Sequence, residues 1–159
     1  PLTQLNQSAC APLLDWRYST RLNCQSINDR IINEVAENQY QTIILHSMWF
    51  SEKKPVAFAE IETALAATIR RIKTVSPESQ VVVIANTPRW YISAERAFAK
   101  AEDKGLVKAG QITAAAAVVL PELEAGLQRA ATKEGAKFIA PSQYLCEAGG
   151  QEYRSCLLS

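Results

Sequence analysis

Apolar runs and amphipathic segments alternate along this chain. Residues 42–49 read Thr-Ile-Ile-Leu-His-Ser-Met-Trp, an apolar run that ends in polar and aromatic side chains. Such a run predicts a central parallel strand that is covered on both faces. Ligands of open α/β sheets bind beyond the carboxyl ends of the strands. We therefore expect His46, Ser47 and Trp49 to lie at a functional site.

Other segments continue the alternation of helix and strand. Apolar residues spaced three and four apart predict helices over residues 25–38, from Pro55 to residue 72, and over 121–134. The runs 81–85 and 137–140 predict two further strands. Helices between strands imply right-handed crossovers, so the sequence predicts an α/β fold of three layers, α/β/α, with a mainly parallel sheet. The alanine-rich residues 114–117 are either a helix or a close-packed segment.

The polar residues at the predicted strand ends have more than one interpretation. Neighbouring residues on a strand point to opposite faces, so His46 and Ser47 are not expected to form a local catalytic dyad. His46 is a structural or site-wall residue, a group that contacts substrate, or a catalytic base. Asn86 is either a turn residue before Pro88 or a polar donor near a developing oxyanion. Trp49 belongs to the core or to the site wall.

Composition narrows the class of protein. The chain has 159 residues, of which 48% are hydrophobic and 21% charged, with a formal net charge of +1. These values indicate one soluble globular domain. Basic residues do not cluster with aromatic ones as a nucleic-acid-binding face requires, so nucleic acid is excluded as a partner. No apolar run approaches the roughly 18 residues of a membrane span.

The cysteines fall into two local pairs, Cys10 with Cys24 and Cys146 with Cys156. This arrangement predicts two disulfide loops, with buried free thiols as the alternative. A zinc site is disfavoured because neither pair has the Cys-x-x-Cys spacing and the single histidine lies in another segment. Disulfides persist in oxidising compartments, so we expect the periplasm or the cell surface. A glycine-rich phosphate loop and a dinucleotide fingerprint are absent, which predicts chemistry without a cofactor.

The order of several short motifs is similar to that of a known family. The motifs are Cys-x-Pro-Leu at residues 10–13, Cys24 followed by Asn28, Ile-Ile-Leu-x-x-x-Trp at 43–49, Val-Val-Ile-x-Asn-x-Pro at 82–88, and Tyr-Leu-Cys at 144–146. In this order they resemble the periplasmic SGNH domain, whose sheet is flavodoxin-like. In bacteria that domain is often fused behind membrane-embedded acyltransferase family 3 proteins, which O-acetylate cell-surface carbohydrate.

The resemblance implies roles for some residues and leaves others unassigned. Trp49 matches the tryptophan that ends the family's second central strand, and the two cysteine pairs match its disulfide loops. The family's nucleophile block Gly-Asp-Ser and its Asp-x-x-His block do not occur in this chain. We expect the Gly-Asp-Ser block and the first strand of the sheet to precede Pro1. We expect the Asp-x-x-His block to follow Ser159. The chain is thus predicted to be a single SGNH-like domain, residues 1–159, incomplete at both ends, and its catalytic residues are unknown.

The resemblance also implies a function. The chain would be the central part of a periplasmic SGNH-type domain of an O-acyltransferase, which passes acetyl groups through a serine to carbohydrate of the lipopolysaccharide or peptidoglycan type. Its partners would be the carbohydrate acceptor, an acyl donor and a membrane acyltransferase domain of the same polypeptide, which would tether it to the inner membrane. His46, Ser47, Trp49 and Asn86 would lie on the substrate or oxyanion side. The alternatives are a non-catalytic module that binds glycan or a partner, and a secreted carbohydrate acetylesterase.

Overall fold

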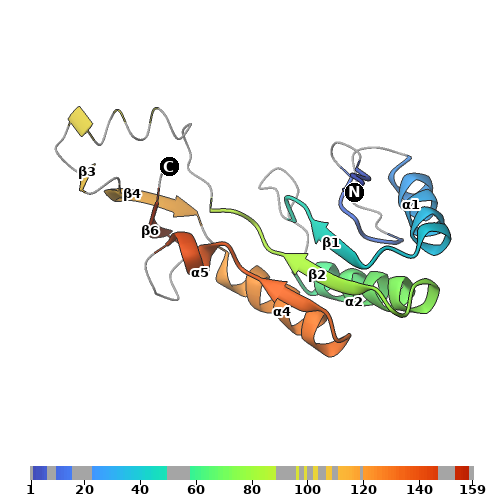
Figure 1. Ribbon diagram of the computed structural model, residues 1–159. Coiled ribbons are helices and arrows are strands. Elements are labelled where there is room, and N and C mark those ends of the chain that lie inside the picture. The colour runs from blue at the N-terminus through green and yellow to red at the C-terminus, as the bar shows by residue number, and fades with distance from the viewer. Residues whose placement is uncertain are drawn as a thin grey trace. The chain divides into compact units, whose positions relative to one another are not determined.

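The architecture comes from a computed structural model, shown in Figure 1. It describes residues 2–6, 10–15, 23–49, 58–88, 96, 99, 102–103, 107–108, 111–118, 120–146 and 153–157. Contacts divide the chain into two compact units. Unit 1 comprises residues 1–85 and 125–139, and unit 2 comprises residues 86–124 and 140–159. The expectation that residues 1–159 form a single domain stays a prediction.

A parallel sheet of three strands forms the centre of unit 1. Its strands are β1 (Thr42–His46), β2 (Gln80–Ile84) and β5 (Lys137–Ile139), in the spatial order β1-β2-β5. Thr42 lies opposite Gln80, and Val83 lies opposite Phe138. The predicted α/β fold with a parallel sheet is confirmed. The first predicted strand differs from the expectation in two ways. It ends at His46 rather than at residue 49, and it lies at the edge of the described sheet with only Leu45 buried, so it is not a central strand covered on both faces.

Three described helices follow or precede these strands in the chain, and each buries one mainly apolar face. They are α1 (Cys24–Asn38), α2 (Phe58–Val75) and α4 (Pro121–Lys133). Their bounds lie close to the predicted ones, because residues three and four apart share a helix face. The fully or nearly buried side chains are Cys24, Asn28, Ile32 and Val35 in α1, Ile61, Leu65, Thr68, Ile69 and Ile72 in α2, and Leu123, Leu127, Ala130 and Ala131 in α4.

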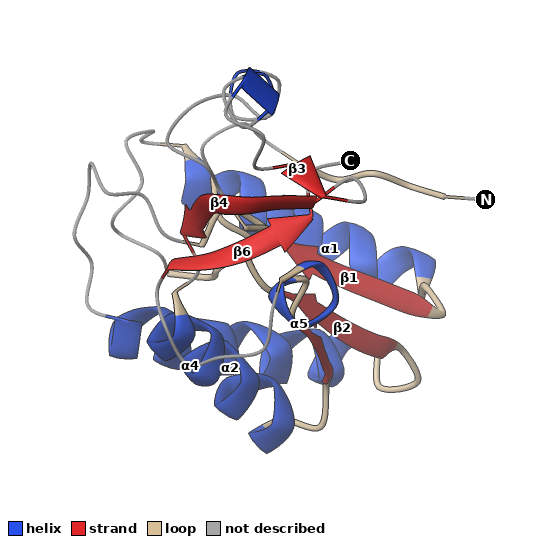
Figure 2. Cartoon of the chain, turned by 90° about the vertical axis from the view of Figure 1, so that its left-hand side faces the viewer, coloured by secondary structure: helices blue, strands red, loops and turns tan. Residues whose placement is uncertain are grey.

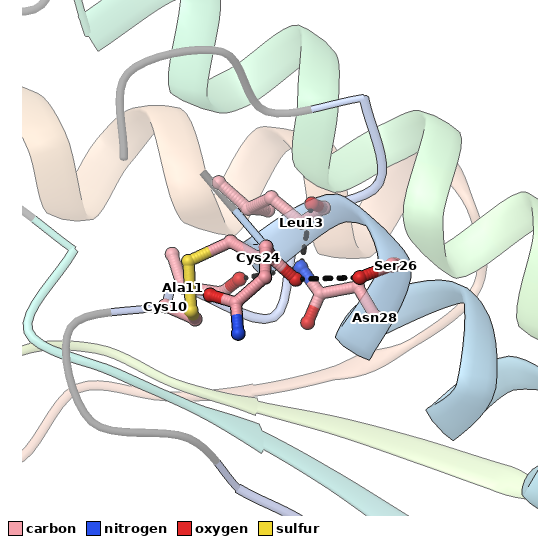
Figure 3. The surroundings of a disulfide bond; sticks show 7 residues. Cys10, Ala11, Leu13, Cys24, Ser26 and Asn28 are labelled. Carbon is pink, nitrogen blue, oxygen red and sulfur yellow. Dashed lines mark hydrogen bonds between the residues drawn. A yellow bond between two sulfur atoms is a disulfide. The ribbon is translucent and has the colours of Figure 1, made fainter. Parts of the chain in front are cut away.

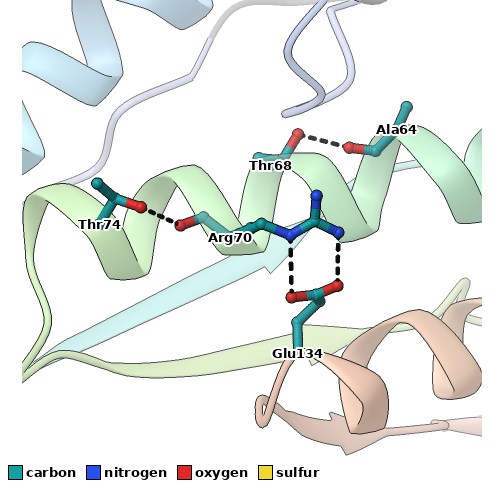
Figure 4. Close-up of polar contacts among 5 residues, drawn as sticks. All are labelled: Ala64, Thr68, Arg70, Thr74 and Glu134. Atoms are coloured by element: carbon teal, nitrogen blue, oxygen red, sulfur yellow. Dashed lines mark hydrogen bonds and ion pairs between the residues drawn. The ribbon is translucent and has the colours of Figure 1, made fainter.

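Ion pairs link α2 to the segment that contains α4 and the residues after it. Arg70 donates to Glu134 through both Nε and Nη2, at 3.3 and 2.7 Å (Figure 4). Arg129 contacts Glu62 in the same two-pronged way, at 3.1 and 2.7 Å. These hydrogen bonds hold the pKa of both glutamates below the usual value. The pairs fix α2 and α4 side by side, as Figure 2 also shows.

A small polar network joins two loops at the amino ends of β1 and β2. Ser76 and Ser79, both buried, share a hydrogen bond of 2.7 Å between their hydroxyl oxygens, and Ser79 Oγ also donates to the carbonyl of Tyr40. Gln39, in the left-handed conformation with φ of 48°, donates through Nε2 to the carbonyl of Val75 at 2.9 Å. Buried hydroxyls are thereby satisfied, and the network lies at the end of the strands opposite to the candidate site.

Unit 2 contains a second sheet, which the sequence did not indicate. Its strands β3 (Val107–Lys108), β4 (Gln111–Val118) and β6 (Tyr153–Leu157) are antiparallel, in the order β3-β4-β6. A helix at residues 114–117 is therefore wrong, because these alanines belong to β4. Pairing of Ala116 and Ala117 with Ser155 and Arg154 of β6 overrides the helix propensity of alanine. A short helix, α5 (Ser142–Leu145), completes the unit, and Ser142 Oγ donates to Glu124 Oε2 at 2.8 Å.

Among the described residues, no helix is both long enough and apolar enough to cross a membrane.

Candidate functional site

The carboxyl ends of β1 and β2 meet around one backbone carbonyl, that of Ile84. The indole Nε1 of Trp49 donates a hydrogen bond to this oxygen at 2.7 Å. Nδ1 of His46 lies 3.4 Å from the same oxygen. Trp49 is only 4% exposed, whereas the side chain of His46 is exposed. Trp49 is therefore part of the core that fixes the strand ends, and His46 presents its ring at the surface there.

The other two candidates each follow a different strand, Ser47 after β1 and Asn86 after β2. Ser47 is half-buried directly after β1. Within the described part of the chain, no hydrogen bond joins it to His46, as expected for neighbours on opposite faces of a strand. Asn86 follows β2 but belongs to unit 2, and it is half-buried. The substrate and oxyanion roles of these residues stay predictions.

A narrow apolar cavity of about 230 Å³ lies between α1 and β1. All five residues of β1 line it, together with Asn28, Ile31, Ile32 and Val35 of α1. Residues of the N-terminal segment, Tyr40 and two side chains of α2 complete the wall: Leu2, Thr3, Leu5, Pro12, Leu14, Tyr40, Thr68 and Ile72. His46 lies at the carboxyl end of β1, so the cavity adjoins the candidate site. No cluster of histidine, cysteine or acidic side chains able to hold a metal ion occurs among the described residues.

The first predicted disulfide, between Cys10 and Cys24, is confirmed. It connects the N-terminal segment to the first residue of α1, with a Cα–Cα distance of 5.3 Å (Figure 3). Cys24 is 2% exposed. The second predicted pair includes Cys156, whose side chain lies outside the described part of the structure.

Comparisons with known proteins decide the family. The model of the family described as "SGNH domain (fused to AT3 domains)" matches residues 1–154. This chain belongs to the SGNH domain family fused to AT3 domains. A comparison with curated proteins finds no match. The resemblance inferred from the motifs is confirmed.

A solved structure supports the fold of this SGNH domain. It is described as the structure of the lipopolysaccharide acetyltransferase periplasmic domain of Salmonella ser. Paratyphi A, with a TM-score of 0.72 and 20% sequence identity. The alignment covers 93% of this chain and 56% of the Salmonella chain. The SGNH domain described here thus spans little more than half the length of that structure.

Asn28 is the residue of this SGNH domain whose role sequence reasoning missed. Its Nδ2 donates to the carbonyls of Ala11 and Leu13, at 2.8 and 2.9 Å, and the side chain is 6% exposed. Figure 3 shows Asn28 close to the disulfide, one turn after Cys24. The signal was present in the sequence, because an asparagine on the apolar face of a predicted helix needs buried hydrogen-bond partners.

Proposed function

We propose that the complete polypeptide containing this SGNH domain is an O-acyltransferase that transfers acetyl groups to cell-surface carbohydrate, of the lipopolysaccharide or peptidoglycan type. The match of residues 1–154 to SGNH domains fused to AT3 domains carries this proposal. The structural likeness to a lipopolysaccharide acetyltransferase periplasmic domain agrees with it. An AT3 domain of the same polypeptide would be the membrane-embedded partner and the source of the acetyl group.

The proposed chemistry proceeds through an acetyl-serine. The serine of a Gly-Asp-Ser block, in chain outside residues 1–159, attacks the carbonyl carbon of the acetyl donor while a histidine of an Asp-x-x-His block accepts its proton. The donor's leaving group departs with that proton. A carbohydrate hydroxyl then attacks the carbonyl carbon of the acetyl-serine and gives its proton to the histidine, which passes the proton to the departing serine oxygen.

The described residues would form one wall of the site in which this transfer takes place. His46 is the exposed polar side chain at the carboxyl end of β1, beside the Ile84 carbonyl at 3.4 Å. We propose that its ring contacts the acceptor or the acetyl donor, and that Ser47 contributes a polar contact from the end of the same strand. For Asn86, which belongs to unit 2, a substrate or oxyanion contact is a separate proposal. Trp49 would hold the wall rigid, because it is buried and hydrogen-bonded to Ile84.

We also propose an extracytoplasmic location. The Cys10–Cys24 disulfide supports it, since such bonds persist in the periplasm and are reduced in the cytosol. The solved relative is itself described as a periplasmic domain. Tethering to the inner membrane would follow from fusion to a membrane-embedded AT3 domain.

The test is carbohydrate acetylation by the complete polypeptide in a host strain that lacks its own copy. The O-acetyl content of the purified surface carbohydrate is measured by proton NMR. Replacing the serine of the Gly-Asp-Ser block by alanine should abolish the acetyl signal, while Thr74→Ala, on the exposed side of α2, should leave it unchanged. Full acetylation by the serine variant would contradict the proposal and favour a non-catalytic module. Free acetate in place of acetylated carbohydrate would indicate an esterase.

A further inference from the structure

The segment that contains Cys10 is attached to α1 by more than the disulfide bond. Asn28 lies one turn after Cys24 on the same helix, and its Nδ2 donates to the carbonyls of Ala11 and Leu13 at 2.8 and 2.9 Å (Figure 3). Ala11 follows Cys10 directly, and Leu13 follows two residues later. One buried amide on the helix therefore holds the backbone beside the second cysteine.

Two further contacts hold the same segment in unit 1. The amide of Leu14 donates to Oγ1 of Thr68 in α2 at 2.9 Å, and Thr68 is 3% exposed. The side chain of Leu13 is 1% exposed. Buried hydrogen bonds and a buried leucine both oppose detachment of a segment. Several contacts that do not involve sulfur thus keep the backbone after Cys10 next to α1.

The two cysteines of the disulfide differ in their access to an external thiol. Cys24 is 2% exposed, whereas Cys10 is half-buried. In thiol–disulfide exchange a thiolate attacks one sulfur of the bond, and the other sulfur leaves as a thiolate. An external thiol therefore attacks Sγ of Cys10, and Cys24 is the leaving group.

We propose that Asn28 is a positioning residue for the Cys10–Cys24 disulfide, which keeps the two sulfurs opposed so that the bond re-forms after attack by a thiol. The attacking thiolate forms a mixed disulfide with Cys10, and Cys24 leaves as a thiolate. With the segment held in place, the Cys24 thiolate attacks Sγ of Cys10 and expels the external thiolate. Complete reduction needs a second external thiolate, which attacks the external sulfur of the mixed disulfide and leaves Cys10 as a thiolate.

The physical basis of this role is effective concentration. Two groups that the fold holds together react in an intramolecular step, which is favoured over the same step between groups on a free chain. The hydrogen bonds of Asn28 thereby favour closure of the bond over its complete reduction. We expect the disulfide to withstand a monothiol such as glutathione better than the same bond without this asparagine.

Glutathione redox buffers test the role of Asn28 in the complete polypeptide. After equilibration, free thiols are blocked with iodoacetamide, and peptide mass spectrometry quantifies the Cys10–Cys24 disulfide, the mixed disulfides and the free thiols. Asn28→Ala should lower the equilibrium constant for closing the bond by about 10-fold. The mixed disulfide should lie on Cys10 in both proteins and should be more abundant in the variant. An unchanged constant, or glutathione mainly on Cys24, would overturn the proposal.

Ser79→Ala is the matched control for general destabilisation. It also removes a buried hydrogen bond, from Ser79 Oγ to the carbonyl of Tyr40, but in the loop before β2. The equilibrium constant should stay unchanged in this variant, and an equal decrease in both variants would overturn the proposal.

Asn28→Ser provides the same readout if Asn28→Ala does not fold. Serine has a single hydroxyl donor, so this variant loses at least one of the two hydrogen bonds. It should lower the equilibrium constant by roughly 2–10-fold. A constant equal to that of the wild type would overturn the role of Asn28.

Discussion

The indole of Trp49 donates its hydrogen bond to the carbonyl of Ile84 at 2.7 Å. This bond connects the segment after β1 to the last residue of β2. Because Trp49 is buried and His46 lies three residues before it, the bond also fixes the part of the chain that presents the histidine ring. The candidate site thus depends on a contact between two residues that lie 35 positions apart.

Removing this donor should destabilise the domain. Trp49→Phe keeps an aromatic ring but loses the N–H group and some volume, and we expect the free energy of unfolding to fall by about 1–3 kcal/mol. Urea unfolding of the purified protein, followed by circular dichroism, measures the loss.

His46→Ala is the matched control at the same strand ends. Its ring is exposed and 3.4 Å from the same carbonyl, so we expect a loss within about 0.5 kcal/mol, as for most surface positions. If His46→Ala lowers the free energy of unfolding as much as Trp49→Phe does, the assignment of Trp49 as the anchor and His46 as a surface group is contradicted.

Asn28 should be replaceable only by a residue that donates hydrogen bonds. Asn28→Ala leaves the carbonyls of Ala11 and Leu13 without this donor, and we expect a loss of about 2–3 kcal/mol. Asn28→Asp should be worse at pH 7, because a buried carboxylate would face two carbonyl oxygens.

The sign of the pH dependence distinguishes the two Asn28 variants. Burial and the two carbonyls would raise the pKa of an aspartate at this position in the folded state. A protonated carboxyl can donate one hydrogen bond, so the deficit of Asn28→Asp relative to Asn28→Ala should shrink as the pH falls below that raised pKa. Unfolding curves at several pH values measure this, and a deficit that does not change with pH would contradict the model of two accepting carbonyls.

The Cys10–Cys24 disulfide should contribute substantially to stability. The two cysteines are separated by 14 positions, and closing a loop of about 15 residues is worth roughly 3 kcal/mol in the chain-entropy model. The double variant Cys10→Ser, Cys24→Ser should therefore unfold at lower denaturant. Dithiothreitol should destabilise the wild-type protein more than this variant; equal effects of the reductant on both proteins would argue against a stabilising bond.

The ion pair between Glu62 and Arg129 should make stability depend on pH in the acid range. The hydrogen bond from Arg129 lowers the pKa of Glu62 in the folded state, so the pair stabilises the protein above the usual pKa of glutamate, about 4.3. That contribution is lost as the pH falls through the lowered pKa.

The variant Arg129→Met tests this dependence. It should have a slightly lower Tm than the wild type at pH 7, and the difference should vanish toward pH 2, because Glu62 is then protonated in both proteins. The effect is small because the side chain of Arg129 is 63% exposed. A difference that persists at low pH would instead reflect lost packing of the arginine side chain.

The local pattern of apolar and β-branched residues was sufficient to predict the helices α1, α2 and α4 and the three parallel strands. Apolar spacing of three and four residues specified the buried helix faces, and β-branched runs specified β1 and β2. Only pairing between distant segments placed residues 114–117 in β4, since alanine by itself favours a helix. The end of β1 at His46 could not be predicted either, because it depends on where the pairing with β2 stops.

The sequence by itself was enough to predict the α/β class, the family resemblance and the Cys10–Cys24 pair, because periodicity, motif order and spacing are properties of the chain alone. Tertiary structure decided which of the strand-end residues is a core anchor and which is exposed, since that depends on where the Ile84 carbonyl lies. It also revealed the cavity between α1 and β1. A run such as Thr-Ile-Ile-Leu predicts a strand covered on both faces, yet only Leu45 of β1 is buried in the described structure, because burial depends on the elements that pack against the strand.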